Sequence, residues 1–299
     1  TVPNPIYIPA ASDLNSTVTF NVEVTPLNNC GDNVSDSVLY TINAAPTALA
    51  GANATICENN NIYLLQSTVT NSDSINWTST GSGSFDNVSI EDPIYTLSPG
   101  DKDSASVTFT VRASQPGCAD VTDVMVLTIQ KNPIANAGNT LQICEGESVT
   151  IGSATAQFSN SYNWIRSGGS GNFINDDTLS PTYISVLGES GTVNLTLTAD
   201  AISPCTVPAS SQTEIIITPK PFVDAGDDAQ ICEGESYTID SATNINTAGL
   251  IWTSNGNGIF QLGTDTSLSP TYTPGSFDIN SGEVTLTLTG IENFPCNTD

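Results

Sequence analysis

The chain has 299 residues and a formal net charge of -26, because 31 acidic side chains stand against 5 lysines and arginines. Binding to phosphate needs clustered cations, so this charge excludes nucleic acid as a partner and argues against anionic membrane surfaces. Histidine is absent, which excludes Ser-His-Asp and Cys-His catalysis and histidine-based zinc sites. No run of about 18 apolar residues occurs, so we expect no direct membrane insertion.

Residues 1–43 are interpreted as the back half of a repeat. Asn4-Pro5-Ile6-Tyr7 matches Asp92-Pro93-Ile94-Tyr95 of the next copy. The stretch from Val18 to Val24 alternates apolar and polar residues with a period of two, which is typical of a strand with one packed face. The front half of this copy is missing, and we therefore expect the chain to be a window on a longer protein.

Three further copies follow, with predicted bounds of 44–131, 132–219 and 220–299, the last lacking its final strand. Their shared positions recur every 87 or 88 residues and are a proline, a first cysteine and a tryptophan: Pro46, Pro133, Pro221; Cys57, Cys144, Cys232; Trp77, Trp164, Trp252. A later cysteine closes each copy at intervals of 88, 87 and 91 residues: Cys30, Cys118, Cys205, Cys296. A period near 90 suits one small domain per repeat.

Each copy is predicted to be all-β. Alternating strands are expected at Val107–Val111, Val193–Thr198 and Val284–Thr289, and another surrounds each tryptophan. About seven short strands per copy indicate an immunoglobulin-like β-sandwich with the tryptophan as its core anchor. The linkers are short and contain proline, so we expect the copies to string end to end as an elongated rod.

The cysteine pattern indicates an oxidising, extracellular compartment, and two pairing schemes stay open. Pairing within copies gives Cys57–Cys118, Cys144–Cys205 and Cys232–Cys296, and leaves Cys30 alone. In an immunoglobulin-like topology the two cysteines of one copy lie at opposite poles, too far apart to bridge. That geometry gives instead Cys57–Cys205 and Cys144–Cys296, across the junctions between copies.

No enzyme is expected. The paired carboxylates of Cys144-Glu145-Gly146-Glu147 recur in Cys232-Glu233-Gly234-Glu235, and a motif copied into adjacent repeats indicates a structural turn. The glycine-rich turns after each tryptophan are predicted hairpin turns, because no Gly-Lys-Ser/Thr follows them. Asp224, Asp227 and Asp228 form a weak calcium candidate, and no other cofactor or metal is expected.

The recurring strings Pro133–Gly138, Ile143–Gly146, Leu179–Tyr183 and Gly191–Ala199 resemble the tandem PKD-like and immunoglobulin-like repeats of Bacteroidota surface proteins, in particular SprB-type gliding-motility adhesins. The resemblance implies a cell-surface filament exported by type IX secretion. It also implies O-glycosylation where Asp precedes Ser or Thr and an aliphatic residue, at Ser37, Ser74, Ser104, Thr178 and Ser241. From the residues alone, the same pattern is an ordinary turn.

The predicted function is a structural and adhesive segment of a long extracellular filament. Its partners would be neighbouring repeats of the same chain and a surface polysaccharide or the substratum. Two alternatives stay open: a glycan-binding module that uses Tyr63, Tyr162 or Tyr237, and a spacer in a large secreted protein whose active domain lies outside this window.

Overall fold

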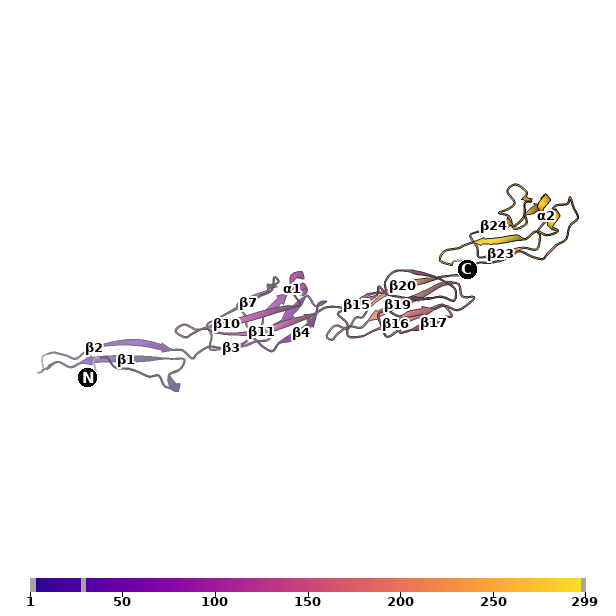
Figure 1. The fold of residues 1–299 in the computed structure, drawn as a ribbon. Coiled ribbons are helices and arrows are strands. Elements are labelled where there is room, and N and C mark those ends of the chain that lie inside the picture. The colour runs from indigo at the N-terminus through magenta and orange to yellow at the C-terminus, as the bar shows by residue number, and fades with distance from the viewer. Residues whose placement is uncertain (1–3, 28–30, 297–299) are drawn as a thin grey trace. The chain divides into compact units, whose positions relative to one another are not determined.

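The computed structural model describes residues 4–27 and 31–296, and the regular secondary structure of these residues is almost all β-strand (Figure 1). They divide into two compact units. The first runs to Asn132 and includes the loop Ile202–Thr206, and the second comprises Pro133–Ala201 and the residues from Val207 onward. No helix in these ranges is long and apolar enough to cross a membrane.

The N-terminal partial repeat is a single hairpin. The 3-10 turn η1 (Ala11–Asp13) precedes β1 (Ser16–Val24) and β2 (Val34–Ile42). The two strands are antiparallel, with Ser16 opposite Ile42 and Val24 opposite Val34. No other strand of the described residues joins this two-stranded sheet, so most of its apolar side chains stay exposed.

The first complete repeat is a sandwich. Its elements are β3 (Thr47–Leu49), β4 (Ala54–Cys57), β5 (Ile62–Leu64), β6 (Thr68–Thr70), β7 (Ser74–Ser79), β8 (Ser84–Phe85), β9 (Ile94–Thr96), α1 (Pro99–Ser104), β10 (Ser106–Ser114) and β11 (Val121–Gln130). A sheet of order β4-β11-β10-β7 faces the sheet β5-β9-β8 and the pair β3-β6. Only the β11–β4 pairing in the larger sheet is parallel. Val107, Phe109 and Val111 alternate into the core, as the period of two predicts.

The second repeat has the same plan. Its strands are β12 (Ile134–Asn136), β13 (Leu141–Cys144), β14 (Ser148–Thr150), β15 (Thr155–Gln157), β16 (Tyr162–Ser167), β17 (Asn172–Ile174), β18 (Thr182–Ile184), β19 (Gly191–Ala199) and β20 (Ala209–Thr218). The sheet β13-β20-β19-β16 packs with β14-β18-β17 and with the pair β12-β15. Again the final strand, β20, pairs in parallel with the cysteine-bearing strand, β13.

The third repeat is incomplete. It contains β21 (Phe222–Asp224), β22 (Tyr237–Thr238), β23 (Thr243–Ile245), β24 (Gly249–Ser254), β25 (Ile259–Phe260), β26 (Thr271–Thr273), α2 (Ser276–Ser281) and β27 (Leu286–Ile291). The larger sheet is reduced to β24-β27, and no described strand takes the positions of β13 and β20. Five residues make up its buried core cluster, against thirteen and eleven in the two complete repeats.

The prediction of an all-β chain of immunoglobulin-like sandwiches is confirmed. One predicted strand starts later than expected, because β27 begins at Leu286 and not at Val284. In the second repeat the start of the equivalent strand pairs only with β20, as Val193 does with Ile215. The third repeat has no counterpart of β20 among its described residues, so the first positions of the predicted strand have no paired strand on that side.

Candidate functional site

A tyrosine contacts a carboxylate six residues later, once in the partial repeat and once in each of the three others. The pairs are Tyr7 with Asp13, Tyr95 with Asp101, Tyr183 with Glu189, and Tyr272 with Asp278. The tyrosine Oη donates to the carboxylate at 3.1 Å in the Tyr95 pair and at 2.8 Å in the Tyr272 pair. We call each pair, with the amides that bind it, a tyrosine–carboxylate cluster.

Backbone amides complete each cluster. A local N–H three residues before the acid donates to it, as Ser98 does to Asp101 Oδ2 at 2.9 Å. The glycine-rich turn supplies a second donor, Ser82 N at 2.7 Å from Asp101 Oδ1. The second and third repeats use Ser170 N at 2.8 Å from Glu189 Oε1, and Asn257 N and Gly258 N at 2.9 Å from the Asp278 carboxylate. The carboxylate therefore ties the turn after the tryptophan strand to the loop before the next long strand.

The glycine in this turn is required by close backbone approach. A Cβ on Gly83 would lie 2.2 Å from the carbonyl oxygen of Thr96. The equivalent distances are 2.2 Å for Gly171 and 2.4 Å for Gly258. No side chain fits at these distances, which explains why the turn is glycine-rich in each of these repeats.

The carboxylates of the three full clusters are buried and ionised. Asp101, Glu189 and Asp278 are 2%, 6% and 4% exposed. Burial alone would raise the pKa of each, but the hydrogen bonds from backbone amides and from the tyrosine outweigh it and hold each pKa below its usual range. Burial, in contrast, is the main cause that raises the pKa of Tyr95, Tyr183 and Tyr272. The acid is thus the acceptor and the tyrosine the donor near neutral pH.

Sequence reasoning missed these clusters, although a signal was present. The tyrosines recur at intervals of 88, 88 and 89 residues, and the acids six residues later recur at the same intervals. The third acid is a glutamate where the others are aspartates, which disguises the repeat. Among the described residues no buried side-chain nitrogen or oxygen lacks a hydrogen-bond partner, so the arrangement suits a structural clamp.

Two disulfides are formed in the structure, Cys57–Cys205 and Cys144–Cys296, each with a Cα–Cα distance of 4.9 Å. This is the cross-junction scheme, and the within-copy pairs are not formed. The reason lies in strand pairing. Cys57 ends β4 opposite Gln130 of β11, and the Gln130 carbonyl oxygen is 3.3 Å from the Cys205 Sγ. The loop that carries Cys205 belongs to the first unit for the same reason.

Two cysteines among the described residues carry no disulfide, the half-buried Cys118 and the exposed Cys232. The Cys118 Sγ lies 3.7 Å from the carbonyl oxygen of Asn43 and 3.8 Å from that of Ala44. Cys30, the remaining predicted disulfide cysteine, lies outside the described residues.

All three predicted anchor tryptophans are buried in the cores of their repeats. Trp77, Trp164 and Trp252 are 2%, 5% and 3% exposed. Each indole Nε1 donates to a backbone carbonyl, that of Ile90, Thr178 or Ser267, at 3.1 to 3.2 Å. Their contribution to stability stays a prediction.

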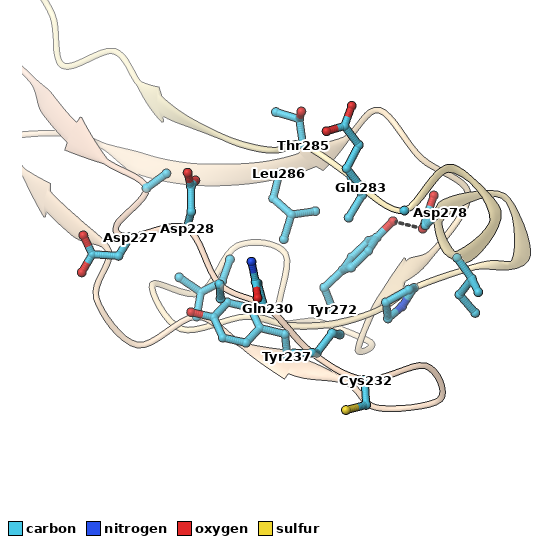
Figure 2. Close-up of a pocket in the computed structure, with 18 of the residues that line it drawn as sticks. Asp227, Asp228, Gln230, Cys232, Tyr237, Tyr272, Asp278, Glu283, Thr285 and Leu286 are labelled. Carbon is cyan, nitrogen blue, oxygen red and sulfur yellow. Dashed lines mark hydrogen bonds between the residues drawn. The ribbon is translucent and has the colours of Figure 1, made fainter.

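The third repeat contains a groove of about 820 Å³ that opens onto its core. Figure 2 shows Leu286 on one side of it and Tyr237 on the other, with Tyr272 farther to the right and hydrogen-bonded there to Asp278. Acidic side chains at the rim include Asp227, Asp228 and Glu283. In the two complete repeats the final strand of the larger sheet, β11 or β20, covers the corresponding part of the core.

Two of the three calcium candidates take part in local hydrogen bonds, Asp224 through its carboxylate and Asp227 through its backbone amide. Asp224 Oδ1 accepts from the Gly226 amide at 3.0 Å, and the Asp227 amide donates to Ser241 Oγ at 3.1 Å. Within the ranges that the structure covers, no three His, Cys, Asp or Glu side chains form a group that could hold a metal ion. Calcium binding at Asp224, Asp227 and Asp228 stays a prediction.

The five glycosylation candidates are exposed: Ser37, Ser74, Ser104, Thr178 and Ser241. Two of their hydroxyls are engaged with backbone, since Thr178 Oγ1 donates to Asn175 O and Ser241 Oγ accepts from Asp227 N. The tyrosines considered for glycan binding are half-buried and pack against the cores: Tyr63, Tyr162 and Tyr237. They do not form an exposed aromatic face.

No protein-family model matches the chain, and no curated protein matches it. Similar solved structures include the protocadherin gamma B2 extracellular cadherin domains 3-6, at 15% identity and a TM-score of 0.41, covering 91% of this chain and 78% of that one. The titin domains I67-I69 match at 13% identity and a TM-score of 0.47, covering 83% of this chain and 98% of that one. DIP-gamma IG1+IG2 matches at 14% identity and a TM-score of 0.40, covering 58% of this chain and 98% of that one.

Proposed function

We propose that this chain is a non-catalytic, extracellular structural segment that resists extension. The observation that carries the proposal is the pairing of cysteines from successive repeats, Cys57 with Cys205 and Cys144 with Cys296. Disulfides persist in oxidising compartments outside the cell. The tyrosine–carboxylate clusters support the same reading, because they stiffen each sandwich internally.

The two disulfide loops overlap, and this overlap limits how far the chain can be pulled. Residues 144–205 belong to both loops. Along the backbone, Cys57 and Cys296 are separated by 296 - 57 = 239 residues. Through the two S–S bonds, the shortest covalent path contains only 205 - 144 = 61 residues. At about 3.5 Å per residue, the fully extended length falls from about 840 Å to about 210 Å.

Single-molecule force spectroscopy tests this function. The chain is held by handles attached outside residues 57–296 and pulled with and without a reductant. The fully extended length between Cys57 and Cys296 should be near the 61-residue value in oxidising buffer and near the 239-residue value after reduction. Equal extension in both buffers would show that the disulfides do not limit stretching and would overturn the proposal.

At the finer level, we propose that the segment belongs to an adhesive surface filament of the gliding-motility type, exported by type IX secretion and O-glycosylated. The support is the resemblance of the repeat strings and the exposure of Ser37, Ser74, Ser104, Thr178 and Ser241. An intact mass of natively produced protein above the polypeptide mass, with glycan mapped to these positions, is expected. A native mass equal to that of the polypeptide would remove the glycosylation.

A further inference from the structure

We propose that Asn255 is a site of spontaneous deamidation, and that the Asp278 carboxylate protects Asn257, two residues farther along the chain, from the same reaction. The inference goes beyond the structural role proposed above, since it concerns a covalent modification of the chain and a chemical role for one tyrosine–carboxylate cluster.

The glycine-rich turn of the third repeat contains two asparagine–glycine pairs in succession, Asn255-Gly256 and Asn257-Gly258. No other asparagine of the sequence precedes a glycine. Because glycine has no side chain, its amide nitrogen can approach the carboxamide of the preceding asparagine closely, which makes this the dipeptide that deamidates most readily. The sequence alone gives the two pairs the same reactivity.

The reaction needs only water. The backbone nitrogen of the glycine attacks the Cγ atom of the asparagine, so that an N–Cγ bond forms and the Cγ–Nδ2 bond breaks. The proton of the attacking amide leaves with the Nδ2 group as ammonia. A water molecule then opens the cyclic imide, and the product is an aspartate or an isoaspartate.

The carboxamide oxygens of the two asparagines are held alike. Asn255 Oδ1 accepts from Thr285 N at 2.8 Å, and Asn257 Oδ1 accepts from Phe277 N at 2.9 Å. A donor at this oxygen stabilises the negative charge that develops there during the attack. Both asparagines are also exposed, so access to water does not separate them. The difference lies in the attacking nitrogen.

The attacking amide is bound in one pair only. Gly258 N donates to Asp278 Oδ2 at 2.9 Å, and Asn257 N donates to Oδ1 of the same carboxylate at 2.9 Å. The Asp278 side chain is buried, and Figure 2 shows its further contact with Tyr272. In contrast, no described residue accepts a hydrogen bond from Gly256 N.

The contact with Asp278 slows the reaction at Asn257 for two reasons. Gly258 N must first give up a hydrogen bond to a charged acceptor, and the typical strength of such a bond corresponds to an attack about 10- to 100-fold slower. The nitrogen must also lose its proton, and an ionised carboxylate beside it opposes the negative charge that remains. Gly256 N carries neither penalty.

The environment of Asn255 recurs in the complete repeats. Its counterpart three residues after the tryptophan of the first repeat is Thr80, whose Oγ1 accepts from Thr108 N at 3.0 Å. Thr80 is exposed, and so is Ser167 at this position of the second repeat, although another repeat follows each of them. The exposure of Asn255 is therefore a property of this turn in every repeat.

The protected asparagine is the one whose modification would damage the cluster. An isoaspartate at position 257 would lengthen the backbone between Asn257 N and Gly258 N, the two amides that hold the Asp278 carboxylate. At position 255 the new carboxylate would lie on the surface and would still offer an oxygen to Thr285 N.

The test follows both positions in the full chain by peptide mass spectrometry during incubation at mildly alkaline pH. The folded chain is compared with the same chain in denaturant. In denaturant the two positions should convert at similar rates, whereas in the folded chain position 257 should convert about 10- to 100-fold more slowly than position 255. Equal rates in the folded chain, faster conversion at 257, or a folded chain that stays intact at 255 would overturn the proposal.

Two variants identify the protecting group. Asp278→Ala removes the acceptor of Gly258 N and should raise the rate at 257 to near that at 255. Tyr272→Phe removes the hydroxyl that binds the same carboxylate but leaves the amide contact, and should keep position 257 protected. The fluorescence of Trp252 reports whether each variant is folded. An Asp278→Ala chain that folds and stays protected at 257 would contradict the role of the carboxylate.

A third variant checks the assignment of the reactive site. Asn255→Thr introduces the residue that the first repeat has at Thr80, and its hydroxyl can accept from Thr285 N as Thr80 accepts from Thr108 N. It should remove the conversion at 255 and leave the slow rate at 257 unchanged. The comparison of folded and denatured parent chain decides the proposal where a variant fails to fold.

Discussion

The second and third repeats carry nearly the same front-half sequence but place it differently. Ile143-Cys144-Glu145-Gly146 begins in strand β13, whereas Ile231-Cys232-Glu233-Gly234 lies in an irregular segment. The difference lies in the partner, because β20 pairs with β13 and no described strand pairs with the third repeat's segment. A short strand at this position is thus created by its neighbour and not by its own propensity.

The tyrosine–carboxylate cluster shows the opposite behaviour. It is intact in the third repeat, where Tyr272 donates to Asp278, even though the sheet beside it is reduced to two strands. Its parts come from one loop and one turn, and α2 needs no final strand to form. Elements whose contacts are close in sequence survive the loss of a strand, and elements that depend on distant pairing do not.

The largest expected effect concerns the bond between the complete and incomplete repeats. Replacing both Cys144 and Cys296 by serine removes a closure of 152 residues. The chain-entropy model gives a loss of about 5 kcal/mol in the free energy of unfolding. In a denaturant titration, this loss should appear chiefly in the unfolding transition that is followed by the fluorescence of Trp252. If the double variant unfolds at the parent denaturant concentration, the third repeat does not depend on the bond.

Removing the core tryptophan should cost more stability in the second repeat than in the third. Trp164→Ala removes a buried indole from a closed sandwich and should cost about 3–5 kcal/mol. Trp252→Ala should cost less, because the groove already leaves its core with fewer buried neighbours. Ile165→Ala, at a 57% exposed position on the same strand as Trp164, is the control and should be close to neutral. Equal costs at Trp164 and Trp252 would contradict this comparison.

The carboxylate clusters offer a matched pair of substitutions. Asp101→Asn keeps the size of the side chain but sets an amide against buried N–H donors, and should cost about 1–3 kcal/mol. Asp13 accepts hydrogen bonds from the Tyr7 hydroxyl and from the backbone amide of Ala10, but its side chain is only half-buried. No glycine-rich turn contacts it among the described residues. Asp13→Asn should leave thermal unfolding of the complete repeats unchanged. A measurable loss there would mean that the hairpin supports them.

The smallest expected effect is a loss of folding stability at acidic pH. Asp101 and Glu189 have pKa values below their usual range when folded, so their stabilisation is present above the pKa of the unfolded chain, near 4. It is lost as the pH falls through the lower, folded value. The melting temperature should therefore drop below about pH 4, with a shallower slope for Asp101→Asn. An identical slope in both proteins would show that this carboxylate does not control acid unfolding.

Much of the fold could be predicted from the sequence. The recurrence of Cys57, Trp77 and Cys118 in later copies established the repeat, and the alternation of Val107–Val111 established strand β10. The candidate site was predicted only in part. The cysteines were recognised, but two pairing schemes remained, and the tyrosine–carboxylate clusters were missed because Tyr95 and Asp101 are ordinary residues until burial makes them partners.

The amino-acid order alone determined the strand periodicity, the burial of one tryptophan per copy and the acidic, histidine-free surface, since these depend on composition and on neighbours in the chain. Tertiary structure decided the rest. Which sulfurs meet depends on where β11 and β20 end, and whether residues 229–232 form a strand depends on a partner strand. Such contacts join positions tens to hundreds of residues apart, and no local pattern encodes distances of that kind.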